Sequence, residues 1–157
     1  MLRLGLGVAA VVVVLDQLVK LSLIDFLAGQ PRAVAVGPFL DLVMVWNRGV
    51  SFGLFNSAAA GEVQRWLLVA LSLGIVAALG VWLGRVGDRL LALSIGLIVG
   101  GALGNVIDRL RFGAVADFFY FHLGAYYWPA FNLADSAIVV GVAVLLYDSL
   151  FRRPEGG

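Results

Sequence analysis

The sequence contains no cysteine, a single histidine and a single lysine among its 157 residues. The absence of cysteine excludes a thiol nucleophile, thiolate metal ligands and disulfide bonds, and it is compatible with a position on the oxidising side of a membrane. Charged residues are also scarce, at 13% of the chain, whereas soluble domains contain about 25%. The net charge of +1 gives no electrostatic reason to expect nucleic acid as a partner.

Apolar residues make up most of what is present. They account for 62% of the chain, and the mean hydropathy is +1.00, so lipid is the expected solvent for most of the surface. The chain has no low-complexity segment, soluble-domain linker or internal repeat. We therefore predict a single integral membrane domain over residues 1–157.

Four segments are long enough to cross a bilayer as helices, which needs roughly 20 mainly apolar residues. They cover about residues 4–24, 66–84, 90–110 and 131–151. The middle two contain uncharged stretches that lie between Arg65 and Arg85 and between Arg89 and Asp108. The first and last are assigned on length, because polar residues interrupt them, namely Asp16, Gln17 and Lys20 in the first and Asp135 and Asp148 in the last.

The N-terminal segment also has the elements of a cleavable secretory signal. Arg3 precedes an apolar run over residues 4–15, and the sequence "AVA" follows at 33–35. However, Asp16 and Lys20 continue on a helical repeat, and the apolar pattern resumes to Ile24. We therefore favour a retained first helix over a cleaved signal.

Arginine placement predicts the orientation, because cytoplasmic loops are enriched in positive charge. With four spans, Arg3, the loop carrying Arg85 and Arg89, and the 152–153 pair share the cytoplasmic side. Both termini are then inside, and the two longer connections, 25–65 and 110–130, are outside. Residues 33–55 are rich in Val and Phe and punctuated by Gly and Pro, which indicates short strands. The expected fold is an all-α membrane protein with four transmembrane helices and a small extracytoplasmic β-sheet in an outer loop of about 30–58.

The polar residues of the spans fall at one depth. At 1.5 Å per residue, Asn105 lies about 24 Å and Arg109 about 30 Å beyond Arg89, which brings them to the outer interface with Asp108. Asn132 and Asp135 begin the last span at that level, and Asp16 and Lys20 form a favourable i,i+4 pair in the outer half of the first. Three glycines every fourth residue allow another helix to approach closely; they are Gly96, Gly100 and Gly104.

Several kinds of chemistry are open to this set of residues. A zinc hydrolase is disfavoured, because His122 has no second histidine and no HExxH motif accompanies it. A Ser–Lys dyad would have to use Lys20, and its candidate serines, Ser22 and Ser51, have no motif around them. A four-helix transport or scaffold protein with a polar relay is the alternative from another class. The inner halves of the middle spans, however, contain no ionisable residue that would continue a relay.

Two aspartates remain as a candidate pair at the outer face. Asp117 follows the third span and Asp135 begins the fourth. Two neighbouring carboxylates share a proton, so one can activate water while the other polarises a carbonyl, without metal or cofactor. The alternative is structural, with Asp117 in a turn and Asp135 in a helix first turn, where the dipole favours it.

Four blocks of the sequence resemble bacterial lipoprotein signal peptidase (signal peptidase II), in family order and over nearly the whole chain. They are "DQLVK" at 16–20, "NRGVSFG" at 47–53, "GGALGNVIDRLRFGAVADFF" at 100–119 and "FNLADSAIVVG" at 131–141. The resemblance implies a four-helix inner-membrane aspartyl endopeptidase that needs no cofactor or metal, with its site at the periplasmic face. It implies cleavage of diacylglyceryl-modified prolipoproteins on the amino side of the lipidated cysteine. Further implied partners are membrane lipid and family-type inhibitors such as the cyclic peptide globomycin.

The resemblance also implies roles for individual residues. Asp117 and Asp135 correspond to the catalytic aspartates. The remaining polar motif positions divide into substrate-binding or dyad-supporting residues (Asn47, Gly49, Asn105, Arg109 and Asn132) and structural residues (Asp16, Lys20 and Asp108). We expect Asp108 to pair with a nearby arginine such as Arg111. One departure from the family pattern is Ser51, where a small residue such as alanine is common; it bears on substrate fit and leaves the aspartates untouched.

Overall fold

A computed structural model of the chain describes residues 1–30, 33–49 and 58–151. Within this part, four helices are long and apolar enough to cross a membrane, so the predicted fold class is confirmed. They are α1 (Leu2–Ala28), α2 (Ala58–Leu83), α3 (Arg89–Phe112) and α4 (Leu133–Phe151).

The helix boundaries differ from the predicted spans where polar residues continue or cap a helix. α2 begins well before residue 66, and in its added turns Arg65 pairs with Glu62 at 3.1 Å, one turn apart. A hydropathy scan does not extend the predicted helix over these turns, because they contain charged residues. α4 begins later than residue 131, because Asn132 caps its N-terminus and is not itself helical.

The central helix is α3. Within the protein 67% of its apolar window is buried, compared with 11–17% for the other three helices. A Cβ on Gly96 would lie 2.6 Å from the Gly5 carbonyl oxygen, and one on Gly100 would lie 2.7 Å from Val12 Cβ. The predicted glycine ridge therefore packs against α1, while Gly101, in the adjacent row, faces Ala134 at the start of α4.

A four-stranded antiparallel sheet covers one end of the helices. Its order is β1 (Ala33–Ala35), β2 (Leu40–Asn47), β3 (Val115–Leu123) and β4 (Tyr126–Tyr127). The sequence predicted strands only within 33–55, and β3 and β4 come from the connection that we left unassigned. β3 was missed because its first four residues, Val115 to Phe118, are all buried and therefore show no alternation of buried and exposed positions. Residues 50–57 of the predicted outer loop lie outside the described part.

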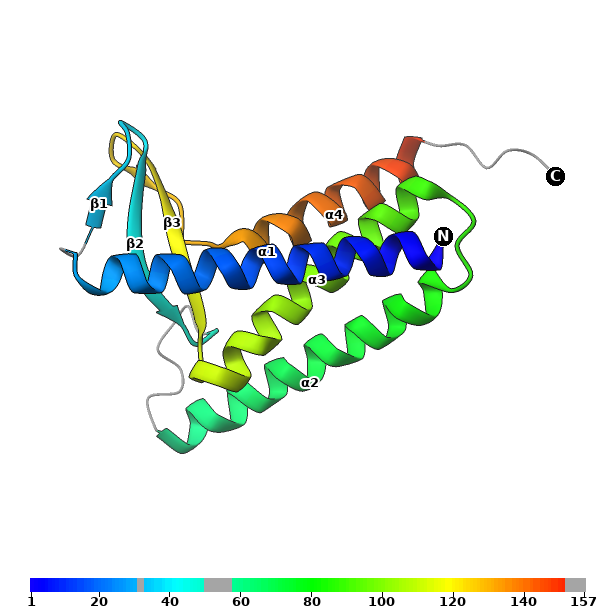
Figure 1. The fold of residues 1–157 in the computed structure, drawn as a ribbon, viewed down its shortest axis with the longest axis horizontal. Coiled ribbons are helices and arrows are strands. Elements are labelled where there is room, and N and C mark those ends of the chain that lie inside the picture. The colour runs from blue at the N-terminus through cyan, green and yellow to red at the C-terminus, as the bar shows by residue number, and fades with distance from the viewer. Residues whose placement is uncertain (31–32, 50–57, 152–157) are drawn as a thin grey trace.

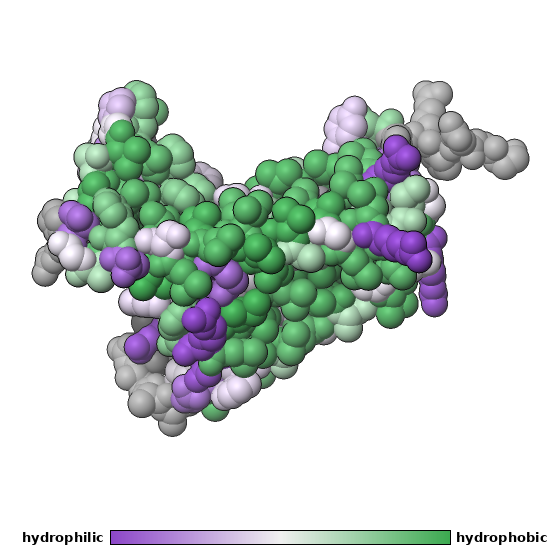
Figure 2. Space-filling view, viewed as in Figure 1, coloured by the Kyte–Doolittle hydropathy of each residue, from purple (hydrophilic) through white to green (hydrophobic). Residues whose placement is uncertain are grey.

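Figure 1 shows the sheet at one end of the helices, with the N-terminus, the α2–α3 turn and the end of α4 at the other. Leu27 of α1 forms a buried cluster with Ala116 and Phe118 of β3, and this cluster attaches the sheet to the helices. Apolar residues form a band over the helices, and hydrophilic residues gather towards both ends (Figure 2). The band is the surface that lipid would contact.

Candidate active site

The turn after α3 brings Asp117 back over the helix ends. Gly113 ends α3 in the left-handed conformation, with φ 76°, and donates its N–H to the Arg109 carbonyl at 3.1 Å. The chain then enters β3, where Asp117 lies opposite Val45 of β2, just beyond a bulge. Asp117 is only 1% exposed. It lies in a strand, so the alternative that places it in a turn is wrong.

Asp135 belongs to the capping arrangement of α4. The Asp135 N–H donates to Asn132 Oδ1 at 2.9 Å, and the Asn132 N–H donates to Asp135 Oδ2 at 3.2 Å. This reciprocal pair is a capping box built from Asn and Asp, and it satisfies two backbone donors at the helix start. The same contacts hold the Asp135 carboxylate at the helix N-terminus.

Two asparagine amides connect the two aspartates. Asn132 Nδ2 donates to Asp117 Oδ1 at 2.7 Å, and Asn105 Nδ2 donates to Asp135 Oδ1 at 2.8 Å. Asn132 Nδ2 also reaches Asn105 Oδ1 at 3.3 Å. The structure therefore brings residues from β3, α3 and α4 to one place, as the depth argument predicted.

β2 supplies a further amide to the other side of Asp117. Asn47 Nδ2 donates to Asp117 Oδ2 at 3.0 Å, and Asn47 Oδ1 accepts the Gly49 N–H at 2.7 Å. Gly49 has φ 86°, a conformation that favours glycine. Gly49 thus orients the Asn47 amide so that its donor faces the carboxylate.

A buried ion cluster lies behind the aspartates. Lys20 Nζ contacts Asp16 Oδ2 at 2.9 Å, as predicted, and Asp108 Oδ2 at 2.7 Å. The predicted pairing of Asp108 with Arg111 is wrong, because Lys20 lies closer across the α1–α3 interface. Lys20 Nζ also donates to Asn105 Oδ1 at 3.2 Å. Its three donors are thus occupied, which argues against a Ser–Lys dyad.

Arg109 lies at the rim of this group. Its Nη1 donates to the Asn105 carbonyl at 3.4 Å, and the side chain is half-buried. Its charge acts on both Asp135 and Asp117. A guanidinium in this position has donors left for an incoming carbonyl or ester oxygen.

Burial controls the proton affinity of Asp117. The pKa of this carboxyl is raised from 3.8 to about 6, because burial and the charge of Asp135 raise it by more than the hydrogen bonds from Asn47 and Asn132 and the Lys20 charge lower it. Burial is the largest of these effects. A carboxyl with this pKa can hold a proton near neutrality, which suits a pair that shares one.

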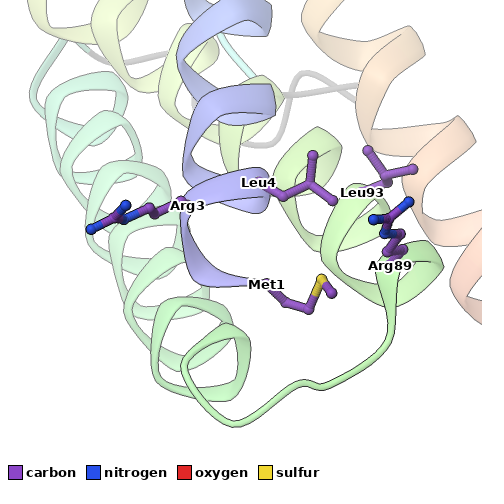
Figure 3. A pocket seen from close by; sticks show the side chains of 5 residues that line it. All are labelled: Met1, Arg3, Leu4, Arg89 and Leu93. Atoms are coloured by element: carbon purple, nitrogen blue, oxygen red, sulfur yellow. The ribbon is translucent and has the colours of Figure 1, made fainter.

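Other polar groups lie away from this place. His122 Nε2 is 3.4 Å from Asp41 Oδ2 on the sheet, and no group of three or more potential metal ligands occurs in the described residues. A cavity of about 510 Å³ opens at the opposite end of the helices, where Figure 3 shows Arg3 directed away from Arg89 and Leu93. None of its lining residues is acidic.

Sequence reasoning missed one member of the site. The sequence alone predicts no role for Gln17, yet its Nε2 donates to Asp108 Oδ1 at 3.0 Å and to Asp16 Oδ2 at 3.2 Å. An amide next to Asp16 within an apolar helix was the available signal.

Comparison with known proteins gives consistent matches over the whole chain. A family model described as "Signal peptidase (SPase) II" matches residues 8–151. The lipoprotein signal peptidase of Methylobacterium sp. (strain 4-46) is 51% identical, covering 99% of this chain and 93% of that protein. That of Burkholderia mallei (strain SAVP1) is 49% identical, covering 96% and 89%. A bacterial membrane enzyme structure obtained by the in meso method at 1.9 Å resolution has a TM-score of 0.77 at 27% identity, covering 95% and 94%.

Proposed function

The chain belongs to the signal peptidase II family, the lipoprotein signal peptidases, and from this premise we propose that it is an aspartic peptidase with Asp117 and Asp135 as its catalytic pair. It removes signal peptides from prolipoproteins. The observation that carries the catalytic assignment is the shared amide scaffold, in which Asn132 contacts both aspartates.

The proposed reaction uses one proton held by the pair. Burial raises the pKa of Asp117 to about 6, so Asp117 holds the proton and polarises the scissile carbonyl. Asp135, half-buried and linked to Asp117 through Asn132, takes a proton from water, and the water oxygen attacks the carbonyl carbon. The C–N bond then breaks as the leaving nitrogen receives a proton from the pair.

Neighbouring residues would bind substrate or support the pair. Arg109 has free donors for backbone or lipid ester oxygens, and Asn47, held by Gly49, approaches from the sheet. Asn105 and Asn132 orient the carboxylates, and the cluster of Asp16, Lys20 and Asp108 supports them structurally. In this proposal the residues from 1 to 157 form one peptidase domain.

The proposed substrate is a diacylated prolipoprotein, cut on the amino side of its lipidated cysteine. Such a substrate combines a signal helix with acyl chains and moves laterally in the bilayer. The site is formed by β3 and by the ends of α3 and α4, and Figure 1 shows these helix ends next to the sheet. We infer that this is the depth at which a signal helix gives way to aqueous chain. We propose that this end faces the periplasm from the inner membrane, with both termini cytoplasmic. Globomycin, a cyclic peptide, is the proposed inhibitor of the same site, and no nucleic acid partner is expected.

The transport or scaffold alternative is not favoured. A relay needs ionisable groups through the full membrane thickness. In the part of the chain that the structure describes, the buried ionisable residues gather at the sheet end of the helices; they are Asp16, Lys20, Asp108 and Asp117. The family relationship points to peptidase activity instead.

Replacement of either catalytic aspartate tests the proposal. Asp117→Asn and Asp135→Asn should each lower the turnover of a diacylated prolipoprotein by at least about a hundredfold, because a positioned acid or base contributes that much. A gel-shift assay in detergent measures the cleavage. Asp148→Asn is the matched control, since Asp148 lies in the last turn of α4, far from the pair, and it should retain activity. Near-normal turnover in either variant of the pair would refute the assignment.

A further inference from the structure

The buried ion cluster holds the backbone immediately before each aspartate of the pair. Asp108 Oδ2 accepts the Ala116 N–H at 3.2 Å, and Asp16 Oδ1 accepts the Ala134 N–H at 3.0 Å. Ala116 precedes Asp117 and Ala134 precedes Asp135, and both alanines are fully buried. No water reaches these two N–H groups, so the carboxylates of Asp16 and Asp108 fix the first residues of α4 and β3, respectively, just before the two aspartates.

The cluster contains one cation for two carboxylates. Asp16 and Asp108 are both fully buried, and Lys20 is 2% exposed. All three Lys20 donors are used, on Asp16, Asp108 and Asn105. A buried carboxylate needs further hydrogen bonds to offset the lost solvation, and Lys20 cannot provide them.

Gln17 supplies the missing donor. Its Nε2 lies between the two carboxylates, 3.0 Å from Asp108 Oδ1 and 3.2 Å from Asp16 Oδ2. In the described part of the chain, no other donor reaches Asp108 Oδ1. Arg111 Nη1 donates to Gln17 Oε1 at 3.4 Å and so turns the amide with its NH₂ group towards the acids.

We propose that Gln17 is a positioning residue for the peptidase reaction, acting on Asp117 through Asp108 and on Asp135 through Asp16. This inference rests on the proposed catalytic pair. Gln17 contacts neither catalytic carboxylate. Without its amide, Asp108 Oδ1 loses its donor and the carboxylate can rotate, which weakens its hold on the Ala116 N–H.

A small displacement of this kind affects catalysis more than binding. Misplacement of a reacting group by about 1 Å can cost about a hundredfold in rate, and the loss of one donor should move Asp117 by less. We therefore expect Gln17→Leu to lower kcat by about tenfold. KM should stay within about twofold of the wild type, because Gln17 lies behind the pair and away from substrate.

Gln17→Glu separates positioning from simple packing. The charged groups that face position 17 are Asp16 and Lys20 on α1 and Asp108 and Arg111 on α3. When neutral, the introduced carboxyl can donate to Asp108, but when ionised it has no donor and repels both acids. The ratio of mutant to wild-type kcat should therefore rise as the pH falls from 8 to about 5, whereas the Gln17→Leu ratio should stay flat.

The experiment measures kcat, KM and the thermal midpoint of the full chain in detergent, on a diacylated prolipoprotein. Gln30→Leu is the matched control, because Gln30 is exposed just beyond the end of α1, and it should behave as wild type. The ratio of Gln17→Glu kcat to wild-type kcat is measured at each pH on one preparation of each protein. Its pH dependence therefore remains interpretable even if Gln17→Leu folds poorly.

Two results would overturn the inference: a Gln17→Leu kcat within about twofold of wild type, or a Gln17→Glu ratio that does not change with pH. Asp117→Asn and Asp135→Asn are assayed in parallel. If these two are inactive while Gln17→Leu is normal, only the role of Gln17 fails. If they are active, the catalytic pair itself is wrong.

Discussion

At the scale of single residues, two opposing effects on the pKa of Asp117 decide its protonation. Both of its carboxylate oxygens accept amide hydrogen bonds, from Asn132 and Asn47, and these bonds favour the ionised form. Burial outweighs them and raises the pKa to about 6. The carboxyl is therefore oriented by donors and yet able to hold a proton, which a general acid needs.

Removal of Asn47 should shift this balance in a known direction. The donor stabilises the carboxylate, so Asn47→Ala should raise the pKa of Asp117. In the proposed mechanism the singly protonated pair is the active form, so activity should fall as the pH rises through this pKa. The alkaline limb of the kcat/KM profile, near pH 6 in the wild type, should therefore move up by roughly half a pH unit, a modest shift because Asn47 is exposed.

Steady-state assays from about pH 5 to 8 measure this limb in the free enzyme. Gln30→Ala provides a control that removes an exposed amide away from the site. An unchanged limb, or one that moves to lower pH, would mean that Asn47 does not stabilise the ionised form of Asp117.

At the scale of the elements, α3 organises the molecule through its glycines. One row of them meets α1 and the neighbouring row meets α4. Gly104 leaves room for the Asp16 carboxylate, because a Cβ there would lie 2.5 Å from Asp16 Oδ2. The same glycines of α3 thus allow both the close approach of the helices and the burial of the ion cluster.

A pair of glycine-to-alanine changes tests this packing. A Cβ at Gly100 would lie 2.8 Å from the Ala9 carbonyl oxygen, and backbone cannot rotate away, so Gly100→Ala should destabilise the protein by about 1–3 kcal/mol. Gly74 in α2 has no neighbour within 4 Å of its added Cβ, and Gly74→Ala should be neutral or stabilise by about 0.5–1 kcal/mol. Thermal unfolding in detergent compares the two variants. Equal unfolding midpoints for Gly100→Ala and Gly74→Ala would contradict the close packing of the glycine ridge against α1.

At the scale of the whole molecule, the two ends differ in what they carry. The sheet and the proposed site lie at one end, and the α2–α3 turn lies at the other (Figure 1). Arginines flank that turn, at 85 and 89. The positive-inside rule predicts that this end is cytoplasmic and that the sheet end faces outwards.

The lack of native cysteine makes this orientation directly measurable. In spheroplasts a membrane-impermeant maleimide should label Tyr126→Cys, because Tyr126 is 83% exposed on the sheet. Gly87→Cys, in the α2–α3 turn, should be labelled only after permeabilisation. The cysteine-free parent gives the background labelling. If Gly87→Cys were labelled in spheroplasts and Tyr126→Cys only after permeabilisation, the orientation would be the opposite of the predicted one.

The sequence by itself determined the class of the protein and the chemistry it carries. Four apolar segments, the glycine spacing in 96–104 and the common depth of the polar residues are local properties, since hydropathy and helical rise depend only on neighbouring residues. They predicted the helices, the close approach of another helix to the glycine ridge, and the placement of Asp117 and Asp135 at one end.

Only the tertiary structure decided which groups touch. β3 was missed because its first four residues are buried on both faces and show no alternation. Its partner β2 lies some 70 residues away in sequence, as the Asn47–Asp117 contact shows. Asp108 pairs with Lys20 across a helix interface and not with its neighbour Arg111, and Gln17 gains its role from the same interface. Hydrogen bonds and ion pairs between distant segments depend on how the helices pack, and local spacing does not encode that.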